Sequence, residues 1–172
     1  MQAENLAVES NRGLSLRPVT DADEPFVREL YASTRSEELA MVPWTEEQRS
    51  AFIEMQFKAQ SNHYQQHFPG ATHEIIVKNG ADVGRLYVQR LEREIEIMDL
   101  TILPRERNAG IGRMLMQEIL EEAGQLGKSV GIYVETFNPS KRFFERLGFK
   151  ETEQSGVHVH LLWFPPKINS TD

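Results

Sequence analysis

Between residues 94 and 134 the sequence changes from strand-like to helical hydrophobic periodicity and back again. Glu94–Leu103 alternates apolar with polar side chains and stops at Pro104. Gly110–Leu126 then repeats apolar residues at helical spacing until Gly127. Val130–Val134 is a short apolar run of the kind found in buried strands. Two strands on either side of a helix are expected to lie parallel, joined by a right-handed crossover.

The residues around this unit also carry signals of regular structure. His73–Lys78 and Asp82–Leu91 flank Asn79-Gly80, a pair that favours the tight turn of a β-hairpin. Residues 45–48, Thr-Glu-Glu-Gln, have the spacing of a capping box that opens a helix. Hairpin strands followed by alternating strands and helices predict an α+β fold, a mixed sheet with helices against it. The other expected elements are a strand at Leu14–Leu16, a helix after Thr20 or Asp21 with Phe26, Val27, Leu30 and Tyr31 on one face, a helix at Ser140–Leu147 and a last strand at Val157–Phe164.

Length and composition fit one folded domain. The chain has 172 residues, of which 40% are hydrophobic and 26% charged, which suffices for one core and is too apolar for a disordered chain. We expect this domain to span residues 13–166, with a flexible polar tail at 1–12 and another at 167–172. No internal repeat or low-complexity linker divides it.

Charge and cysteine content exclude several classes of protein. The net charge of −7 has the wrong sign for binding a phosphate backbone, so no nucleic-acid partner is expected. Without cysteine, neither disulfides nor thiolate zinc sites can form. The first residues lack the basic and apolar regions of a signal peptide, and no apolar run reaches membrane-spanning length. These features predict a cytoplasmic protein with no membrane partner.

The segment from Leu103 to Arg113 carries the most specific chemical signal. It lies between an expected strand and an expected helix, where free backbone N–H groups and the helix dipole favour an anion. Gly110 and Gly112 let the backbone approach that anion closely, and arginines at 105, 107 and 113 concentrate positive charge in an acidic chain. A pyrophosphate is the expected ligand. The alternative is a tight turn that only packs a helix on a sheet.

Two common phosphate loops do not fit these residues. A dinucleotide-binding fingerprint needs a third glycine where Leu115 stands, and a Walker loop needs Gly-Lys-Ser/Thr. Arg107-x-x-Gly110-x-Gly112 instead resembles the acetyl-CoA signature of the GNAT superfamily of N-acetyltransferases, Arg/Gln-x-x-Gly-x-Gly/Ala. Asn138–Phe149 resembles the second signature of that family, an Asn-led helix followed by Gly-Phe. The resemblance extends over residues 14–164 and is specific over 94–149.

The resemblance implies the GNAT fold, a mostly antiparallel sheet with one splayed parallel strand pair, and direct acetyl transfer without a covalent enzyme intermediate. The pantetheine arm of acetyl-CoA would lie in the gap between Leu100–Leu103 and Val130–Val134. The N–H of Ile102 would bind the acetyl carbonyl as an oxyanion donor. For Lys141 a solvated helix face is the alternative. The cofactor-binding residues that the resemblance implies are Leu100, Ile102, Leu103, Arg107, Asn108, Ala109, Gly110, Ile111, Gly112, Arg113, Asn138, Lys141 and Phe144.

Amine acetylation needs a base, because a typical amine with a pKa of about 10 arrives protonated. Glu96 falls where histone-modifying members of the superfamily carry their basic glutamate, and Asp99 interrupts an apolar stretch nearer the expected bulge. Both are candidate catalytic residues. Alternatively, Glu94 and Glu96 form the solvated face of a strand and Asp99 makes a structural hydrogen bond. Deprotonation through water also stays open.

Phe144 departs from the family pattern, which usually has a Tyr at this position to protonate the leaving thiolate of CoA. Phe keeps the aromatic ring but has no proton to donate. Another group or water would then supply the proton, or the departure would need no acid. A third interpretation is that the chain binds acetyl-CoA without fast turnover, as a non-catalytic acyl-CoA-binding sensor or interaction module.

The acceptor is expected near the first helices. Residues 37–56 hold five glutamates against one arginine, a surface that would attract a cationic amine. Candidate substrate-binding residues are Glu37, Trp44 and Tyr64, and for each the alternative is a solvated helix face or the core. The histidine pairs at 63 and 67 and at 158 and 160 have no accompanying ligand pattern, so no metal is expected. The expected partners are acetyl-CoA and an amine of a small molecule or peptide, and pairing through the last strand would give a homodimer.

Overall fold

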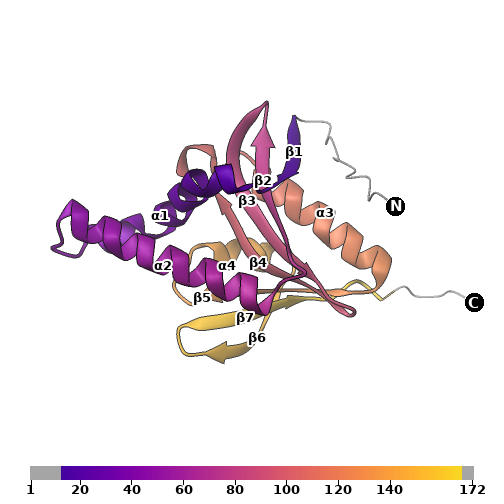
Figure 1. Cartoon of the computed structure of the whole chain (residues 1–172). Coiled ribbons are helices and arrows are strands. Elements are labelled where there is room, and N and C mark those ends of the chain that lie inside the picture. Colours follow the sequence, from indigo (N-terminus) through magenta and orange to yellow (C-terminus); the bar gives the residue numbers. More distant parts are fainter. Residues whose placement is uncertain (1–12, 168–172) are drawn as a thin grey trace, which may run out of the picture. The chain divides into compact units, whose positions relative to one another are not determined.

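The computed structural model describes residues 13–167 (Figure 1). The predicted tail at 1–12 and residues 168–172 of the other tail lie outside the described residues. The strands are Leu14–Pro18 (β1), Thr72–Lys78 (β2), Ala81–Arg90 (β3), Glu94–Ile102 (β4), Ser129–Glu135 (β5), Lys150–Ser155 (β6) and His158–Trp163 (β7). The α-helices are Glu24–Ala40 (α1), Glu46–His67 (α2), Ile111–Leu126 (α3) and Ser140–Arg146 (α4), with short 3-10 helices at Asp21–Asp23 and Pro104–Glu106.

The seven strands of the described chain form one mixed sheet in the order β1-β2-β3-β4-β5-β7-β6. Glu94–Ile97 of β4 pairs in parallel with Ser129–Ile132 of β5. The pairs β1–β2, β5–β7 and β6–β7 are antiparallel. This is the mixed, mostly antiparallel α+β class that the sequence predicted. The parallel pair on either side of α3 confirms the interpretation of the strand–helix–strand unit.

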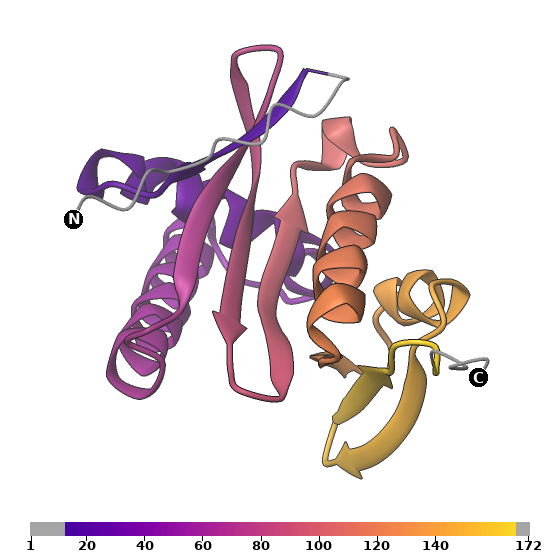
Figure 2. The same ribbon diagram turned by 90° about the vertical axis from the view of Figure 1, so that its right-hand side faces the viewer.

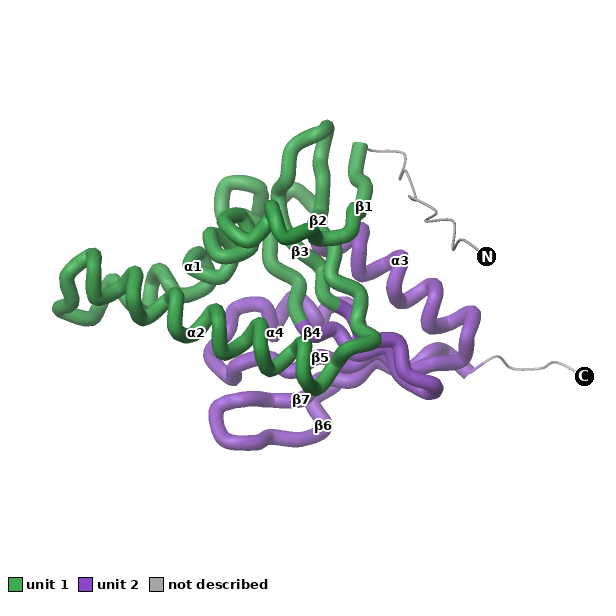
Figure 3. The backbone as a smooth tube through the Cα atoms, in the orientation of Figure 1, with its two compact units in different colours: residues 1–87, 99–111 green, residues 88–98, 112–172 purple. Residues whose placement is uncertain are grey.

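The chain divides into two compact units, which Figure 3 colours separately. Of the described residues, the first unit holds 13–87 and 99–111, and the second holds 88–98 and 112–167. The chain passes from one unit to the other within β3, within β4 and at the start of α3. The expected single domain over 13–166 stays a prediction.

In the first unit, side chains from α1, α2 and β2 share a core. Tyr31 of α1 and Phe57 of α2 meet with ring centroids 6.0 Å apart, and Ile75 of β2 lies in the same buried cluster. Burial of Val27, Leu30 and Tyr31 confirms the apolar face predicted for α1. Each of these side chains contributes about 1.5–3 kcal/mol by leaving water, which holds the two helices to the strand.

Two local signals in the first unit are confirmed by hydrogen bonds and backbone angles. The N–H of Gln48 donates to Thr45 Oγ1 at 3.2 Å and the N–H of Thr45 donates to Gln48 Oε1 at 2.9 Å, which is the predicted capping box. Asn79 and Gly80 have φ of 50° and 80°, as the tight turn between β2 and β3 requires. The hairpin is therefore set by its two turn residues.

In the second unit, β6 is a strand that the sequence did not predict. All six of its residues are exposed, so they show no apolar alternation. It forms because β7, anchored by the buried Val159 and Leu161, offers it backbone partners. Figure 2 shows the two strands as a yellow hairpin. A polar edge strand of this kind discourages pairing with other chains. Within residues 13–167, none of the helices has the length and hydrophobicity needed to cross a membrane.

Arg17 connects β1 to two carboxylates in the first unit. Its guanidinium donates to both carboxylate oxygens of Asp23, at 2.8 and 2.9 Å, and to Asp82 Oδ2 at 2.8 Å. The N–H of Thr20 also donates to Asp23 Oδ2 at 2.8 Å. These hydrogen bonds hold the pKa of Asp23 well below its usual range, and those from Arg17 contribute most.

We expect Asp23→Asn to lower the free energy of unfolding by about 1.5–3 kcal/mol at pH 7, because charged hydrogen bonds to Arg17 are lost. The pKa of Asp23 is lower in the folded than in the unfolded chain. Its carboxylate therefore stabilises the fold fully above the pKa of the unfolded chain, and this stabilisation is lost as the pH falls toward the pKa of the folded state. The difference between variant and wild type should therefore be full above pH 5 and shrink as the pH falls below about 4. Urea denaturation at several pH values measures it, and a difference that does not change with pH would contradict the assignment.

Candidate functional site

The turn between β4 and α3 has a backbone that few residues can adopt. It contains the 3-10 helix Pro104–Glu106, and then Asn108 at φ 59° and Gly110 at φ 81°. Both angles lie in the left-handed region, which glycine adopts freely and asparagine tolerates. The helix α3 begins directly afterwards at Ile111, so its first free N–H groups face the end of this turn.

The predicted cofactor residues in and before this turn divide into anchors and accessible groups. Leu103 and Ile111 are buried, at 1% and 3% exposure, and fasten the two ends of the turn. Arg107 is exposed, and its Nε donates to the carbonyl of Ile102 at 2.9 Å, which holds the guanidinium at the end of β4. Exposed residues are Asn108, Ala109, Gly110 and Arg113, and half-buried ones are Leu100, Ile102 and Gly112.

The strands next to this turn are set by a close backbone contact in the first unit. A Cβ atom on Gly84 of β3 would lie 2.4 Å from the carbonyl oxygen of Thr101 and 3.2 Å from Cα of Ile102. The N–H of Leu103 donates to the carbonyl of Val83 at 2.9 Å. Only glycine fits at this point of β3, so the absence of a side chain fixes where the end of β4 lies.

The parallel ladder between β4 and β5 covers only part of either strand. Its pairs run from Glu94↔Ser129 to Ile97↔Ile132. β4 continues to Ile102 and β5 to Glu135. The predicted cofactor residues on β4 therefore follow the paired stretch.

Three predicted cofactor residues lie in the second unit, in or just before α4. Asn138 is exposed, and its Oδ1 accepts a hydrogen bond from the N–H of Ser140 at 2.9 Å. Lys141 Nζ lies 2.8 Å from Glu151 Oε2, so its charge is paired with a carboxylate. Phe144 is 3% exposed and its ring packs edge-on against Phe149 at 5.4 Å between centroids.

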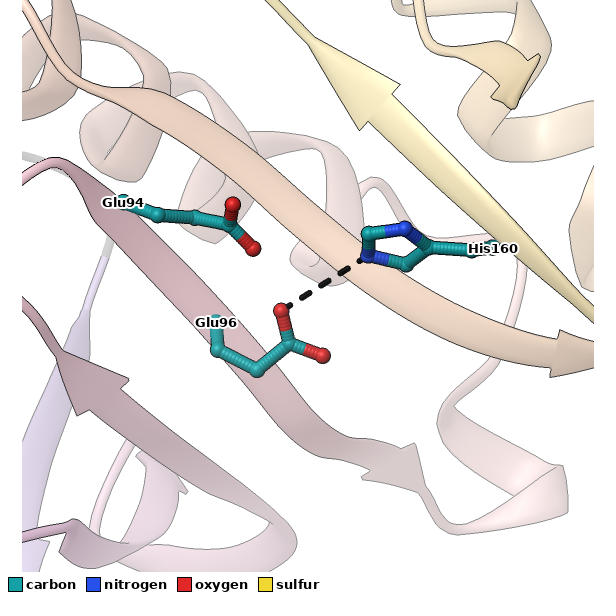
Figure 4. A group of neighbouring side chains, drawn as sticks. All are labelled: Glu94, Glu96 and His160. Atoms are coloured by element: carbon teal, nitrogen blue, oxygen red, sulfur yellow. Dashed lines mark ion pairs between the residues drawn. The ribbon is translucent and has the colours of Figure 1, made fainter. Parts of the chain in front are cut away.

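Glu96 lies on β4 beside Glu94, and its side chain is only 17% exposed. Burial raises the pKa of Glu96 to about 8, with further contributions from a hydrogen bond and the negative charge of Glu94. His160 Nε2 of β7 lies 3.8 Å from Glu96 Oε2, as Figure 4 shows. This face of β4 thus differs from the open solvated face that was the alternative interpretation.

Asp99 lies in a different environment, within the first unit. Arg85, 2% exposed, donates from Nε to Asp99 Oδ2 at 2.6 Å. Thr101 Oγ1 donates to Asp99 Oδ1 at 2.6 Å, and Arg85 also donates to Gln60 Oε1 at 2.8 Å. Both carboxylate oxygens of Asp99 are thus engaged by neighbours. The sequence signal for this network was Arg85 itself, a charged residue within an apolar strand.

The three predicted acceptor residues have separate surroundings in the first unit. Tyr64 of α2 is half-buried, its ring lies 5.0 Å from that of Tyr87, and burial raises its pKa to about 12. Trp44 packs against Phe52 at 5.2 Å and keeps 36% exposure. Glu37 is exposed on α1. Tyr87 and His73, with rings 4.3 Å apart, extend the aromatic surroundings of Tyr64 and were not predicted.

Residues 69–151 match the family model described as the acetyltransferase (GNAT) domain. This stretch includes β4, the turn with Asn108 and Gly110, and α3. Over residues 69–151 the chain therefore falls in the class of GNAT acetyltransferase domains. The resemblance of the two signatures predicted this class, and it is confirmed.

Several solved structures have a similar fold. PaiA N-acetyltransferase of Thermoplasma acidophilum, solved with coenzyme A, is 16% identical, with 88% of this chain and 98% of that chain aligned at a TM-score of 0.67. An acetyltransferase of Thermus thermophilus is 21% identical, with 88% and 96% aligned at 0.62. The protein yncA of Salmonella typhimurium, solved with acetyl-CoA, is 20% identical, with 93% and 98% aligned at 0.55. At these identities the likeness is one of fold. No curated protein matches the sequence.

The environment of Glu96 predicts an unusual titration. Its carboxyl carbon should titrate with an apparent pKa of about 8 in NMR spectra of the folded protein. Glu94→Gln should lower that pKa, because a negative charge is removed, yet leave it above the usual value of about 4.3, because burial remains. Glu92→Gln, a change at an exposed residue nearby, is the matched control and should have no effect. A wild-type Glu96 that titrates like an exposed glutamate would refute the environment described for it.

Proposed function

We propose that this protein is an N-acetyltransferase that moves an acetyl group from acetyl-CoA directly to an amine of a small molecule or peptide, without a covalent enzyme intermediate. The turn between β4 and α3 carries the proposal. Its left-handed Asn108 and Gly110 lead into the free N–H groups of a helix N-terminus, which favour a phosphate. PaiA and yncA, which share the fold, were solved with coenzyme A and acetyl-CoA respectively, which supports the same ligand here.

The residues before and after the turn would hold the rest of the cosubstrate. The pyrophosphate would bind at Arg107–Arg113, and the pantetheine arm would add to the backbone of Leu100–Leu103 as an extra strand does. In this arrangement the N–H of Ile102 would donate to the acetyl carbonyl and stabilise the developing oxyanion. Asn138 would contact the pantetheine arm and Lys141 the nucleotide phosphates, if Lys141 leaves its partner Glu151.

For the catalytic base we propose Glu96 rather than Asp99. Both oxygens of Asp99 accept short hydrogen bonds, from Arg85 and Thr101, and protonation of this carboxylate would leave the buried charge of Arg85 without its partner. The raised pKa of Glu96, about 8, brings its proton affinity close to that of an amine, which suits proton transfer near neutral pH. Glu96 would take the proton of the ammonium, and the freed nitrogen lone pair would attack the acetyl carbon as the C–S bond breaks.

The acceptor proposed here is a cationic amine. The glutamates around Glu37 give that part of the first unit negative charge, which raises the local concentration of cations. Trp44 and Tyr64 offer aromatic faces, which also attract ammonium groups. A cytoplasmic location stays a prediction, and so does a homodimer, but the pairing expected through the last strand is wrong, because β7 already pairs with β5 on one side and with β6 on the other.

Phe144 favours a second candidate function, a non-catalytic acyl-CoA-binding sensor or interaction module. Its buried ring has no hydroxyl to protonate a thiolate, so the usual acid of the family is missing at this position. Release of free CoA thiol distinguishes the two functions, because a binding module retains acetyl-CoA intact. The enzyme remains the first choice because a CoA thiolate can also be protonated by water.

Gly112→Val tests the phosphate-binding turn. Gly112 lies in the first turn of α3, where valine is compatible with a helix but would hold a phosphate away from the backbone. We expect the variant to fold and to lose acetyl-CoA binding by at least about tenfold in calorimetry, since close approach of the anion is blocked. Gly124→Val is the matched control in the same helix, because a Cβ there would meet nothing within 4 Å, and its affinity should be unchanged. Wild-type affinity in a folded Gly112→Val would remove the turn from the site.

Glu96→Gln tests the reaction and its base together. Wild-type protein should release CoA thiol with at least one member of a panel of cationic and neutral amines, and its rate should rise with pH through about 8, as Glu96 loses its proton. The variant should be about 10²–10⁴-fold slower and lose this pH dependence. If Glu96→Gln keeps the wild-type rate, Glu96 is not the base and deprotonation of the amine through water remains. No thiol release with any amine from protein that binds acetyl-CoA would favour the sensor.

A further inference from the structure

Three potential metal ligands of the second unit point toward one another above β5 (Figure 4). Glu94 and Glu96 come from β4 and His160 comes from β7, and their ligand atoms all lie within 4.8 Å of one another. β5 runs between these strands, so the backbones of β4 and β7 are about 9–10 Å apart at this level. The side chains must therefore lean over β5 to meet.

Gly131 of β5 is what allows them to do so. It pairs with Glu96 in the parallel ladder. A Cβ atom on Gly131 would lie 2.5 Å from Glu94 Oε1, 2.7 Å from Glu96 Oε2 and 2.9 Å from His160 Nε2. Any other residue would thus occupy the place where the three ligand atoms converge. The missing side chain creates a small cradle lined by two carboxylates and one imidazole.

The imidazole of His160 is held in a defined orientation. Its ring stacks on Tyr133, with centroids 4.3 Å apart and an interplanar angle of 18°. Nδ1 lies 3.4 Å from Thr152 Oγ1, whose own proton is donated to the carbonyl of His160. That hydroxyl therefore accepts from Nδ1–H, which leaves the lone pair on Nε2. A hydrogen bond from the other ring nitrogen is the usual way in which a metal-binding histidine is oriented.

The Nε2 atom of His160 lacks a hydrogen-bond partner among the described residues, although it is buried. Its nearest charged neighbour, Glu96 Oε2, is 3.8 Å away, too far for a hydrogen bond. A buried nitrogen without a hydrogen-bond partner is unfavourable, and a cation at the centre of the three side chains removes the cost.

We propose that Glu94, Glu96 and His160 bind a divalent transition-metal ion of the Zn²⁺ type. Imidazole nitrogen and carboxylate oxygen both bind Zn²⁺ at about 2.0–2.2 Å, which places tetrahedral ligand atoms about 3.4 Å apart. The present ligand atoms lie within 4.8 Å of one another, so the side chains must rotate closer together to bind the ion. The nitrogen ligand disfavours Mg²⁺ and Ca²⁺, which prefer oxygen alone. Three protein ligands leave a fourth position for water.

The site has a consequence for catalysis that rests on the proposed function. An ion bound to Glu96 occupies the lone pair that would accept the proton of the acceptor amine. The metal is therefore an inhibitor of acetyl transfer, and its removal by a chelator restores the rate. The sequence did not predict this site, because His160 has no ligand pattern near it in the chain.

Binding of Zn²⁺ to chelator-treated full-length protein, measured by calorimetry, tests the site, and Co²⁺ absorption reports the coordination. We expect one ion per chain and a loss of affinity of at least about tenfold in His160→Gln, which removes one of three ligands. His158→Gln, on the same strand, and His63→Gln, beside His67 on α2, are matched controls and should bind as the wild type does. Glu94→Gln removes a different ligand and should also weaken binding, which gives a second test if His160→Gln does not fold.

The proposal is overturned if the wild type binds no ion, or if folded His160→Gln and Glu94→Gln bind as tightly as the two controls. Thiol release separates this inference from the proposed function. Zn²⁺ should slow wild-type and His158→Gln protein, whereas the rate of His160→Gln, compared with and without the ion, should not depend on Zn²⁺. If Zn²⁺ binds as described and the rate is unchanged, the metal site stands and Glu96 is not the base. If metal-free protein releases no thiol, the proposed function fails and the binding data still decide the site.

Discussion

The alternation of side chains along β4 is the constraint on which the candidate chemistry depends. Ile95 and Ile97 are 0% and 1% exposed, so Glu94 and Glu96 must point to the opposite face of the strand. A shift of one residue would bury both carboxylates in apolar surroundings and expose the isoleucines, at a cost of several kcal/mol. The apolar face therefore fixes the carboxylate face, and the end of the same strand leads into the turn of the acetyl-CoA signature.

Two carboxylates on this one strand have different roles because their neighbours differ. Asp99 is the partner of Arg85, and a buried arginine without its carboxylate costs about 3–5 kcal/mol. Asp99 thus has a structural role in the first unit, where it neutralises the charge of the buried Arg85. Glu96 has no arginine beside it, and burial near Glu94 raises its pKa instead of lowering it. The proposal of Glu96 as the base therefore rests on its surroundings and not on its residue type.

The elements that the sequence predicted well are those whose cause is local. Asn79-Gly80 specifies its turn through left-handed backbone angles, and Thr45 with Gln48 specifies a helix start through two hydrogen bonds. The parallel pair followed from a helix between two strands. β6 was missed because its cause is not local: its exposed polar residues form a strand only where β7 offers a partner.

By itself, the sequence indicated the class of the protein through a resemblance, because each of the two signatures, Arg107–Gly112 and Asn138–Phe149, is one continuous stretch of chain. Only the tertiary structure decided which side chains meet. Arg85 of β3 reaches Asp99 of the neighbouring β4, and His160 reaches Glu96 over the glycine at 131, although each pair is separated in the chain. Spacing along a chain carries no information on such contacts, since they depend on strand order and on the space that a missing side chain leaves.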